Sequence, residues 1–414
     1  LEAEVADLVR RLGRDGARPL LGGADPERAL EELLHARRSH YESFPSSVET
    51  SAKSVEQAAA AAERLVSGEV LHVDRPECRQ TIELRYGALE DLQDMLRERS
   101  LTGPLVLLTD ENVNRALGSR LPQSIPTIVI PPGEGLKTLA SVELLCGELA
   151  SAGLDRGGTL IAVGGGVVGD LGGFCASVFM RGVRWVAVPT TVLAMVDASV
   201  GGKTAVNLPA GKNLVGRFHP PALVVSDPLA LATLPERERR SGIAEVVKHA
   251  VISDPSLLAR LESASSFGSL PDIAAAVSVK VKIVACDPLE ENVRATLNFG
   301  HTIGHALEAA SLYALTHGEA VAIGMVAEAR LAERIGVARA GVADRIREVL
   351  ARHGLPTAYA GAAPGSLRAL ISVDKKKAGS ALRFALPADI GRVLHGIVVD
   401  EALLAETLAE IASG

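Results

Sequence analysis

The chain has 414 residues, of which 47% are hydrophobic and only 3% aromatic, so it can bury two or three aliphatic cores. Its formal net charge of −7 argues against a general nucleic-acid or anionic-membrane surface, although a local basic pocket for a small anion remains compatible. Four widely spaced cysteines without a CxxC pair, no signal peptide and no run of about 18 uncharged apolar residues predict reduced thiols, a cytoplasmic location and no membrane span.

Residues 1–68 differ from the rest of the chain. They are polar and helical in pattern, with a helix predicted over Ser54–Val66. Ser67-Gly68 follows and has the composition of a linker. We therefore expect a separate helical segment before the first globular domain.

Residues 69–230 read as an α/β domain. A strand is predicted at Thr81–Tyr86 and a helix from there to about Arg99. Short apolar strands then recur, separated mostly by helical stretches: Leu105–Thr109, Thr159–Val163, Trp185–Val188 and Leu223–Val225. Continuous apolar strands that alternate with helices predict a Rossmann-like parallel sheet covered on both faces.

Residues 231–414 read as a mostly α-helical domain. Strand signals nearly vanish after Asp227, and helical patterns dominate from Pro235 to about His353. A short polar stretch with Lys375–Lys377 follows. We place the boundary between the two domains near residue 230.

Glycines mark two strand ends in the α/β domain. The strand Thr159–Val163 runs directly into Gly164–Asp170, where glycines would let the backbone approach a phosphate and the next helix would offer its amides to the anion. A tight turn without a ligand is the alternative, since the spacing is not GxGxxG. Lys203 follows Gly201-Gly202, so it is a candidate phosphate ligand rather than an ordinary surface charge.

A group of potential metal ligands occupies the helical half. His301 and His305 are four residues apart and share one face of a helix, so spacing alone would name both as zinc ligands. His317 lies twelve residues further on, and Glu245 stands in an apolar helical run where a carboxylate is costly unless paired or metal-bound. Each histidine alone fits a hydrogen-bonded structural role, but together these residues favour a metal site.

Several longer motifs then occur in one order along the chain. They are PPGEGLKTL, GGGVVGDLGGFCASVFMRG, VPTTVLAMVDASVGGKTAVN, GKNLVG, GIAEVVKH, LNFGHTIGHALE and, near the C-terminus, DKKKAG. This set resembles the 3-dehydroquinate synthases, within the sugar phosphate cyclases, across roughly the last 340 residues. The resemblance implies a dehydroquinate synthase-like fold, an NAD-dependent lyase of the shikimate pathway of aromatic amino acid biosynthesis, and a homodimer.

The resemblance also assigns the metal ligands. It implies that Glu245, His301 and His317 hold one divalent ion, zinc or cobalt. His305 is then not a ligand and contacts the substrate phosphate instead, which corrects the interpretation from HxxxH spacing.

The resemblance also implies which residues contact the nucleotide and the substrate. The resemblance implies that NAD meets Asp110, Glu134, Lys137, Gly165, Gly166, Val167, Asp170, Thr190, Thr191, Lys212 and Thr233. It implies substrate contacts for Arg181, Asp197, Lys203, Asn213, Lys248, Lys280, Glu290, Arg294, Asn298, His305 and one or both of Lys375 and Lys376. Catalytic roles are implied for Asp197, Lys203, Lys248, Glu290, Arg294, Asn298 and His305.

These residue types suit the implied reaction, which converts 3-deoxy-D-arabino-heptulosonate 7-phosphate to 3-dehydroquinate and phosphate. The substrate carries an anion at each end, so a cationic pocket is needed. NAD would oxidise one hydroxyl transiently while the metal polarises its oxygen. Phosphate elimination, reduction, ring opening and aldol closure follow, so most of the protein's task is positioning.

Two positions depart from the family pattern. The usual acidic run before Glu290 reads Asp287-Pro288-Leu289, and a usual glycine is Asn292. Asparagine tolerates a left-handed backbone, so we expect the turn to survive.

The first seventy residues carry a second, shorter resemblance. Arg18-Pro19-Leu20-Leu21, Arg37 and Tyr41 resemble the C-terminal part of shikimate kinase, with a family-unrelated helical extension as the alternative. The chain holds no GxxxxGK[ST] phosphate loop, so no kinase activity is expected.

Three other functions compete with dehydroquinate synthesis. Another sugar phosphate cyclase, such as 2-epi-5-epi-valiolone synthase or 2-deoxy-scyllo-inosose synthase, would share the NAD and metal machinery but act on a substrate without the carboxylate. Lys280, Arg294, Asn298, His305 and the Lys375 region favour the dehydroquinate reading. A dehydrogenase of the glycerol dehydrogenase type would release NADH, and a non-catalytic remnant would only bind.

Overall fold

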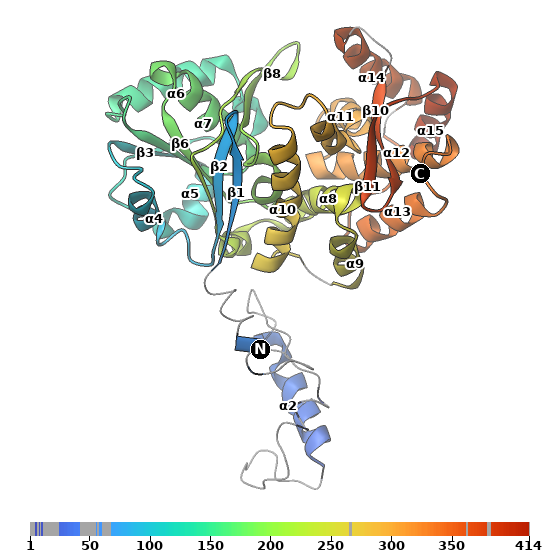
Figure 1. The fold of residues 1–414 in the computed structure, drawn as a ribbon, viewed down its shortest axis with the longest axis horizontal. Coiled ribbons are helices and arrows are strands. Elements are labelled where there is room, and N and C mark those ends of the chain that lie inside the picture. The colour runs from blue at the N-terminus through green and yellow to red at the C-terminus, as the bar shows by residue number, and fades with distance from the viewer. Residues whose placement is uncertain are drawn as a thin grey trace.

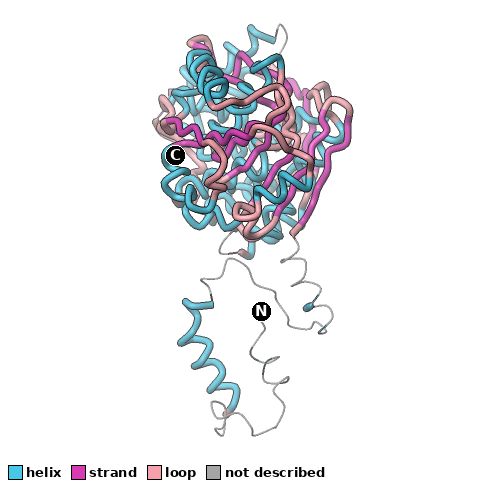
Figure 2. The backbone as a smooth tube through the Cα atoms, turned by 90° about the vertical axis from the view of Figure 1, so that its left-hand side faces the viewer, coloured by secondary structure: helices cyan, strands magenta, loops and turns pink. Residues whose placement is uncertain are grey.

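The computed structural model describes residues 5, 8, 10, 25–41, 55, 58, 59, 68–264, 267–361, 363–378 and 382–413. From residue 68 onward the chain forms one compact body of two lobes, an α/β lobe and a mostly helical lobe (Figures 1 and 2). Most of the predicted helix Ser54–Val66 lies outside the described residues, as does Arg18–Leu21. Arg37 lies exposed on α2 (Pro26–Tyr41).

A seven-stranded sheet forms the centre of the α/β lobe, in the order β1-β2-β9-β6-β5-β3-β4. Every pairing in it is parallel except that between β1 and β2. The strands are β1 (Glu69–Arg75), β2 (Cys78–Leu84), β3 (Leu105–Asp110), β4 (Thr127–Ile130), β5 (Thr159–Gly164), β6 (Arg184–Pro189) and β9 (Leu223–Ser226). All residues of β5 and β9 are buried, which confirms a parallel sheet covered on both faces.

Glycines bring one helix into backbone contact with this sheet. In α7 (Gly166–Val178), a Cβ on Gly172 would lie 2.9 Å from Ala162 Cβ on β5, and one on Gly173 would lie 2.9 Å from the Trp185 ring on β6. A side chain there would push the helix outward. The glycines therefore fix α7 directly behind β5, with its N-terminus at the strand ends.

Two strands and two hairpins of the structure were not predicted from the sequence. The strands β1 and β4 were not predicted, nor were two hairpins, β7 (Lys203–Leu208) with β8 (Gly211–Phe218) and β10 (Arg383–Asp389) with β11 (Arg392–Val398). The hairpins are two-stranded sheets that pack on other elements, and β8 is polar and largely exposed. The expectation of almost no strand after Asp227 is therefore wrong for β10 and β11.

Helices form the second lobe, as predicted from Pro235 onward. They are α8 (Glu236–Ser253), α9 (Pro255–Ser263), α10 (Leu270–Cys286), α11 (His301–Ala310), α12 (His317–Arg334), α13 (Val342–Arg352), α14 (Pro364–Ala378) and α15 (Glu401–Ser413). In the α/β lobe, α4 (Leu92–Glu98), α5 (Glu111–Leu117) and α6 (Leu139–Ser151) accompany the sheet. Helix α10 packs against β1 and β2 and lies between the sheet and the rest of the helical lobe (Figure 1).

The core of the helical lobe lies on the side of α11 and α12 that is turned away from the α/β lobe. Ile303, Leu307, Ile323, Leu386 and Leu408 belong to one cluster of buried apolar side chains there. This packing leaves the opposite edges of α11 and α12 facing the α/β lobe. Within the part of the chain that the structure describes, no helix has the length and apolar character to cross a membrane.

Candidate active site between the two lobes

The carboxyl ends of three adjacent parallel strands open onto the space between the lobes. Asp110 ends β3, Gly165 follows β5, and Thr190 follows β6. Neighbouring parallel strands end at the same sheet edge, which is where open α/β sheets bind ligands. Gly165 is also the N-cap of α7, so amides of the first turn of α7 face this edge.

A cleft of about 1010 Å³ begins at these strand ends and reaches the helical lobe. Its walls include all the residues that the sequence resemblance assigns to NAD, namely Asp110, Glu134, Lys137, Gly165, Gly166, Val167, Asp170, Thr190, Thr191, Lys212 and Thr233. Asn213, His305, Glu308 and His317 line the same cleft. This volume is at the upper end of the range for small-molecule and cofactor pockets.

Several of these residues hold one another in place. Lys137 donates from Nζ to Asp170 Oδ2 at 2.7 Å and to Asn213 Oδ1 at 2.8 Å. Burial lowers the pKa of Lys137, but the carboxylate of Asp170 outweighs this and raises it. Asp110 accepts from the backbone amides of Asn112 and Val113, both at 2.9 Å, which caps α5. The structure thus places Asn213, predicted to contact substrate, beside the nucleotide residue Lys137.

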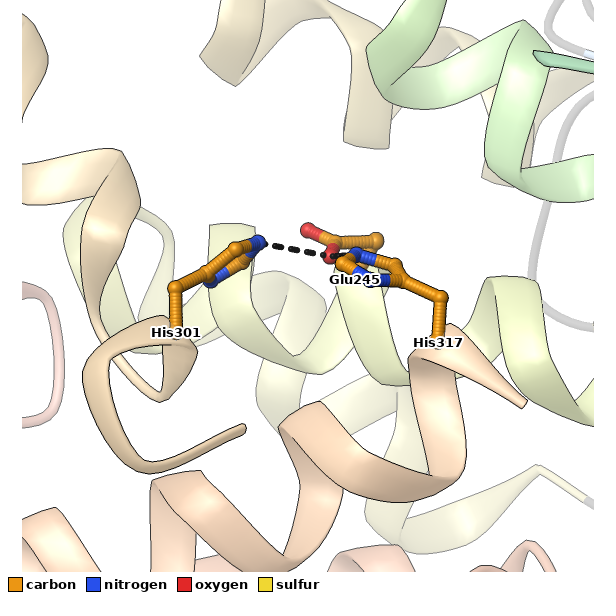
Figure 3. A group of neighbouring side chains, drawn as sticks. All are labelled: Glu245, His301 and His317. Atoms are coloured by element: carbon orange, nitrogen blue, oxygen red, sulfur yellow. Dashed lines mark hydrogen bonds and ion pairs between the residues drawn. The ribbon is translucent and has the colours of Figure 1, made fainter. Parts of the chain in front are cut away.

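Three side chains from three helices meet at the far end of the cleft (Figure 3). Glu245 comes from α8, His301 is the first residue of α11, and His317 is the first residue of α12. His317 Nε2 lies 3.1 Å and His301 Nε2 lies 3.4 Å from the same oxygen, Glu245 Oε1. These three potential ligand atoms all lie within 4.8 Å of one another.

The other nitrogen of each imidazole is already engaged. His301 Nδ1 donates to the carbonyl oxygen of Phe299 at 3.1 Å, and His317 Nδ1 donates to Glu308 Oε2 at 3.3 Å. Metal-bound histidines typically donate in this way to a carbonyl or carboxylate. Each Nε2 is therefore directed at Glu245, as a ligand atom would be.

Electrostatics at this point favour a bound proton or a metal ion between the imidazoles and the carboxylate. A lone pair on Nε2 that faces a carboxylate oxygen is repelled unless a proton or a metal ion lies between them. Burial lowers the pKa of His317, but its hydrogen bonds to Glu245 and Glu308 outweigh this and raise it to about 9. Burial also opposes ionisation of Glu245, yet Lys248 and His301 hold its pKa well below its usual range.

The donor set fits a catalytic metal ion. Two imidazoles and one carboxylate are ligands of catalytic zinc sites, which keep a further position open for water or substrate. A second group, His305, Glu308 and His317, also lies within ligand distance. Glu308 is bonded there to His317 Nδ1 and, at 3.2 Å, to Lys212 Nζ, so it acts as a partner of the candidate ligand His317.

A buried network of charges adjoins Glu245, one of the candidate metal ligands. Lys248 donates to Asp197 Oδ2 at 3.1 Å and also pairs with Glu245, while Lys280 pairs with Asp197 Oδ1. Both lysine side chains are less than a tenth exposed. Burial lowers the pKa of Lys280, and the nearby cation of Lys248 adds to this despite Asp197, so the value falls to about 8. The network holds two cations beside the proposed metal.

A second group of predicted substrate residues lies around Glu290. Lys203 pairs with Glu290, and Asn298 donates from Nδ2 to Glu290 Oε1 at 3.4 Å. Glu290 has a backbone φ of 63°, a left-handed conformation that is unusual for a non-glycine residue. This strained backbone directs its carboxylate toward Lys203 and Asn298.

The turn that contains Glu290 is held differently from the sequence expectation. Asn292 has a φ of −154°, so it is not left-handed, and the expected reason for asparagine there is wrong. Instead, the Asp287 side chain accepts from the backbone amides of Glu291 at 2.9 Å, Asn292 at 2.7 Å and Arg294 at 2.9 Å. Asp287, the acidic residue that remains in this run, therefore supplies the acceptor that closes the turn.

Arg294 reaches the same region from inside the protein. Its side chain is among the largest that are fully buried. Its guanidinium donates to the carbonyl oxygens of Pro288 and of Gly201, the latter at 3.2 Å, and its Nε has no hydrogen-bond partner. Among the described residues, no carboxylate forms an ion pair with it, which leaves a buried cation able to meet an anion.

One residue of the predicted substrate set, Arg181, is not brought to this place. Arg181 lies in a separate surface pocket of about 490 Å³, together with Arg79, Arg156, Arg184 and Arg217. The geometry therefore does not support its predicted contact within one chain. Lys375 and Lys376 belong to α14, but their side chains lie outside the described residues.

Sequence reasoning missed Glu308 as a site residue. Glu308 stands seven residues after His301 and three after His305, so all three share one face of α11. The spacing HxxxHxxE was therefore a usable signal. What it could not show is that the carboxylate reaches His317 on the next helix and Lys212 on β8.

Comparison with known proteins places this geometry in a family. The model described as 3-dehydroquinate synthase N-terminal matches residues 127–241, and that described as 3-dehydroquinate synthase C-terminal matches residues 242–377. A shikimate kinase model matches residues 1–67.

Individual relatives agree with the family models. A 3-dehydroquinate synthase from Synechocystis sp. is 40% identical over 354 residues, covering 81% of this chain and 98% of the relative. One from Xanthomonas campestris pv. campestris is 46% identical over 297 residues, covering 68% and 80%.

Solved structures of related cyclases share the fold. ValA, a 2-epi-5-epi-valiolone synthase from Streptomyces hygroscopicus subsp. jinggangensis with NAD⁺ and Zn²⁺ bound, has a TM-score of 0.74 at 27% identity and covers 83% of this chain and 99% of that chain. A 2-deoxy-scyllo-inosose synthase complexed with carbaglucose-6-phosphate, NAD⁺ and Co²⁺ has a TM-score of 0.75 at 26% identity, covering 83% and 100%.

Proposed function

The chain belongs to the 3-dehydroquinate synthase family, and on that premise we propose that it uses NAD and one divalent cation held between its two lobes. Its function is that of the family: conversion of 3-deoxy-D-arabino-heptulosonate 7-phosphate to 3-dehydroquinate and phosphate. The observation that carries the metal is the direction of two imidazole Nε2 atoms toward one oxygen of the buried Glu245. The two cyclases described above bind NAD⁺ with Zn²⁺ or Co²⁺, which supports the same pair of cofactors here.

The nucleotide would occupy the cleft at the strand ends. The amides of the first turn of α7 offer a site for its phosphates, and glycines at 165 and 166 leave room for them. Lys137 and Lys212 add positive charge on the same wall. Asp110 presents a carboxylate at the end of β3.

When bound, the cofactors would supply the redox and Lewis-acid chemistry: NAD would accept and return a hydride, and a divalent cation would polarise the oxygen of the substrate hydroxyl group whose carbon is oxidised. The chain's own residues position the reacting parts. Glu245, His301 and His317 would hold the cation, whereas His305 lies one turn further along α11, facing the cleft, where it can reach the substrate phosphate.

The charged network binds the two anionic ends of the substrate. Lys248 and Lys280 are buried cations fixed by Asp197, so they need no reorganisation when an anion arrives. Lys203 and Asn298 are held by Glu290, and Arg294 adds a guanidinium without a carboxylate partner among the described residues. Fixed cations of this kind favour the orientation needed for elimination and ring closure.

Metal dependence can be tested by chelation and by two histidine substitutions. Protein treated with a chelator should lose phosphate release from the heptulosonate substrate and regain it with Zn²⁺ or Co²⁺. His317→Ala should lose the metal, measured by elemental analysis after dialysis. His305→Ala is the matched control on the same cleft wall, and it should retain the metal while turnover falls. A His305→Ala protein without metal would show that the ligand set is wrong.

Substrate choice separates this function from that of the other cyclases. The carboxylate of the heptulosonate substrate needs a cation, for which Arg294 and Lys280 are candidates. A charge-assisted hydrogen bond contributes about 1.5–3 kcal/mol, so kcat/KM should fall about a hundredfold or more on sedoheptulose 7-phosphate, which lacks the carboxylate. Equal turnover of the two substrates would instead indicate a valiolone-type cyclase, and net NADH release would indicate a dehydrogenase.

A further inference from the structure

A buried carboxylate lies behind the metal ligands and is not part of the site described above. Glu328 is in the middle of α12, and its side chain is completely buried. Its Oε2 accepts from the backbone amide of Gly300 at 2.6 Å, and its Oε1 accepts from that of Ile303 at 3.1 Å. Among the described residues, only backbone amides bond to this carboxyl group, and no lysine, arginine or histidine forms an ion pair with it.

These two amides belong to the turn that begins α11. Gly300 is the N-cap of α11, with a φ of 80°, and His301 is its first residue. Amides at a helix N-terminus have no partner within the helix, and the helix dipole favours a negative charge there. Glu328 thus caps α11 from another helix, and the cap encloses the metal ligand His301.

Glycines hold the same turn in close contact with α12. A Cβ on Gly300 would lie 2.4 Å from Met325 Cγ, and a Cβ on Gly324 would lie 2.0 Å from the Gly300 carbonyl oxygen. Neither position has room for a side chain. The backbone of α11 therefore packs directly against α12, and the hydrogen bonds to Glu328 hold the first turn of α11 in place along that contact.

Another residue could cap α11 at a lower cost in free energy. A serine or aspartate at the N-cap position is the usual solution, whereas a buried carboxylate carries a desolvation cost that backbone amides only partly offset. What a local cap cannot do is tie His301 to α12, which begins with the other imidazole ligand, His317. Glu328 connects the helices that carry the two imidazoles.

We propose that Glu328 is a positioning residue for the metal site, which keeps the first turn of α11 in the place where His301 Nε2 faces Glu245. This proposal rests on the metal site of the proposed function. It predicts that loss of the Glu328 carboxylate weakens metal binding before it affects NAD binding, because the nucleotide cleft is built mainly from the other lobe. Partners that orient metal ligands typically contribute 10–100-fold in metal affinity.

Glu328→Gln is the decisive variant, since it keeps the size of the side chain. A glutamine has one carbonyl oxygen, so one of the two amides would face its NH₂ group instead of an acceptor. Glu328→Ala would leave both amides without a partner, and it provides a second, more severe test. Ile346→Ala is the control: Ile346 is fully buried on α13, and its truncation lowers stability without touching α11.

The measurement is a titration of chelator-treated protein with Zn²⁺ and with Co²⁺, with thermal unfolding and NAD binding recorded for each protein. We expect Glu328→Gln to weaken metal binding at least tenfold, with NAD affinity within threefold of the unmodified protein. Ile346→Ala should unfold at a lower temperature and bind metal within threefold of the unmodified protein.

Two results would overturn the positioning role alone: unchanged metal affinity in Glu328→Gln, or an equal loss in Ile346→Ala. Failure of the unmodified protein to take up either metal would overturn the metal part of the proposed function and this inference with it. The two failures are therefore distinguishable. If Glu328→Ala does not fold, the near-isosteric Glu328→Gln still decides.

Discussion

Replacing Glu308 by alanine removes one carboxylate that serves two partners. Its Oε2 accepts from His317 Nδ1 at 3.3 Å, and its Oε1 pairs with Lys212 Nζ at 3.2 Å, so it links a metal-ligand helix to the β7–β8 hairpin of the other lobe. Burial raises the pKa of Glu308, but the hydrogen bond from His317 and the charges of His317 and Lys212 outweigh this and lower it to about 2. The carboxylate is therefore ionised at neutral pH.

The two interactions differ in weight. The Glu308 side chain is only 6% exposed, and a hydrogen bond to a buried charged group contributes about 1.5–3 kcal/mol. The Lys212 side chain is 31% exposed, so solvent screens the ion pair and its contribution should stay near or below about 1 kcal/mol. At 1.4 kcal/mol per factor of ten, Glu308→Ala should weaken metal binding about 10–100-fold, mainly through His317.

Metal titration of chelator-treated protein measures this effect, and Lys212→Met is the matched control. It breaks the ion pair but leaves the bond from His317 to Glu308 intact, so metal affinity should change less than threefold. Glu308→Gln should fall between the two, because its amide oxygen still accepts from Nδ1 without a charge. The reasoning is refuted if Glu308→Ala binds metal as tightly as the unmodified protein, or if Lys212→Met weakens binding equally.

Three further outcomes are expected. The charge of Lys280 is lost as pH rises through about 8, so kcat/KM should fall above that pH. In Lys280→Arg, the pH–rate profile should show this fall at a higher pH. A fall at the same pH in both proteins would exclude Lys280 as its source. Asp227 is buried, pairs with Arg120 at 2.7 Å and accepts from the amide of Leu229 at 3.0 Å. Asp227→Ala should therefore lower the free energy of unfolding, measured in urea, by about 3 kcal/mol, and a loss below about 1 kcal/mol would contradict this. Deletion of residues 1–65 should leave cyclase activity largely intact. A deletion protein that folds but has no turnover would show that this segment completes the active site. The undeleted chain should form no shikimate phosphate from ATP and shikimate.

Much of the α/β lobe was readable from the sequence. The apolar runs that became β3, β5, β6 and β9 were found within two residues of their ends, because a strand buried on both faces needs an uninterrupted apolar segment. Glycines after β5 marked the strand end where a ligand can approach the backbone. Polar, exposed or two-stranded elements such as β8 lack that signal, and they were missed.

The types of residue at the site were also fixed in advance, but the identity of each ligand was not. Spacing alone favoured His301 with His305, and only the family resemblance replaced His305 by His317. The tertiary structure supports this prediction: Nδ1 of His301 and of His317 is engaged, and both Nε2 atoms face Glu245. His305 lies one turn along α11, where its ring faces the cleft instead.

Only the tertiary structure decided how distant segments pair. Glu308 meets Lys212 across 96 positions of the chain, and Glu328 meets Gly300 across 28, while Arg181 lies in another pocket altogether. Periodicity and backbone chemistry act over a few residues, so they predict helices, strands and turns. The partner of a side chain depends instead on how whole helices pack, and here that packing is set by glycine contacts and buried charges that no local pattern encodes.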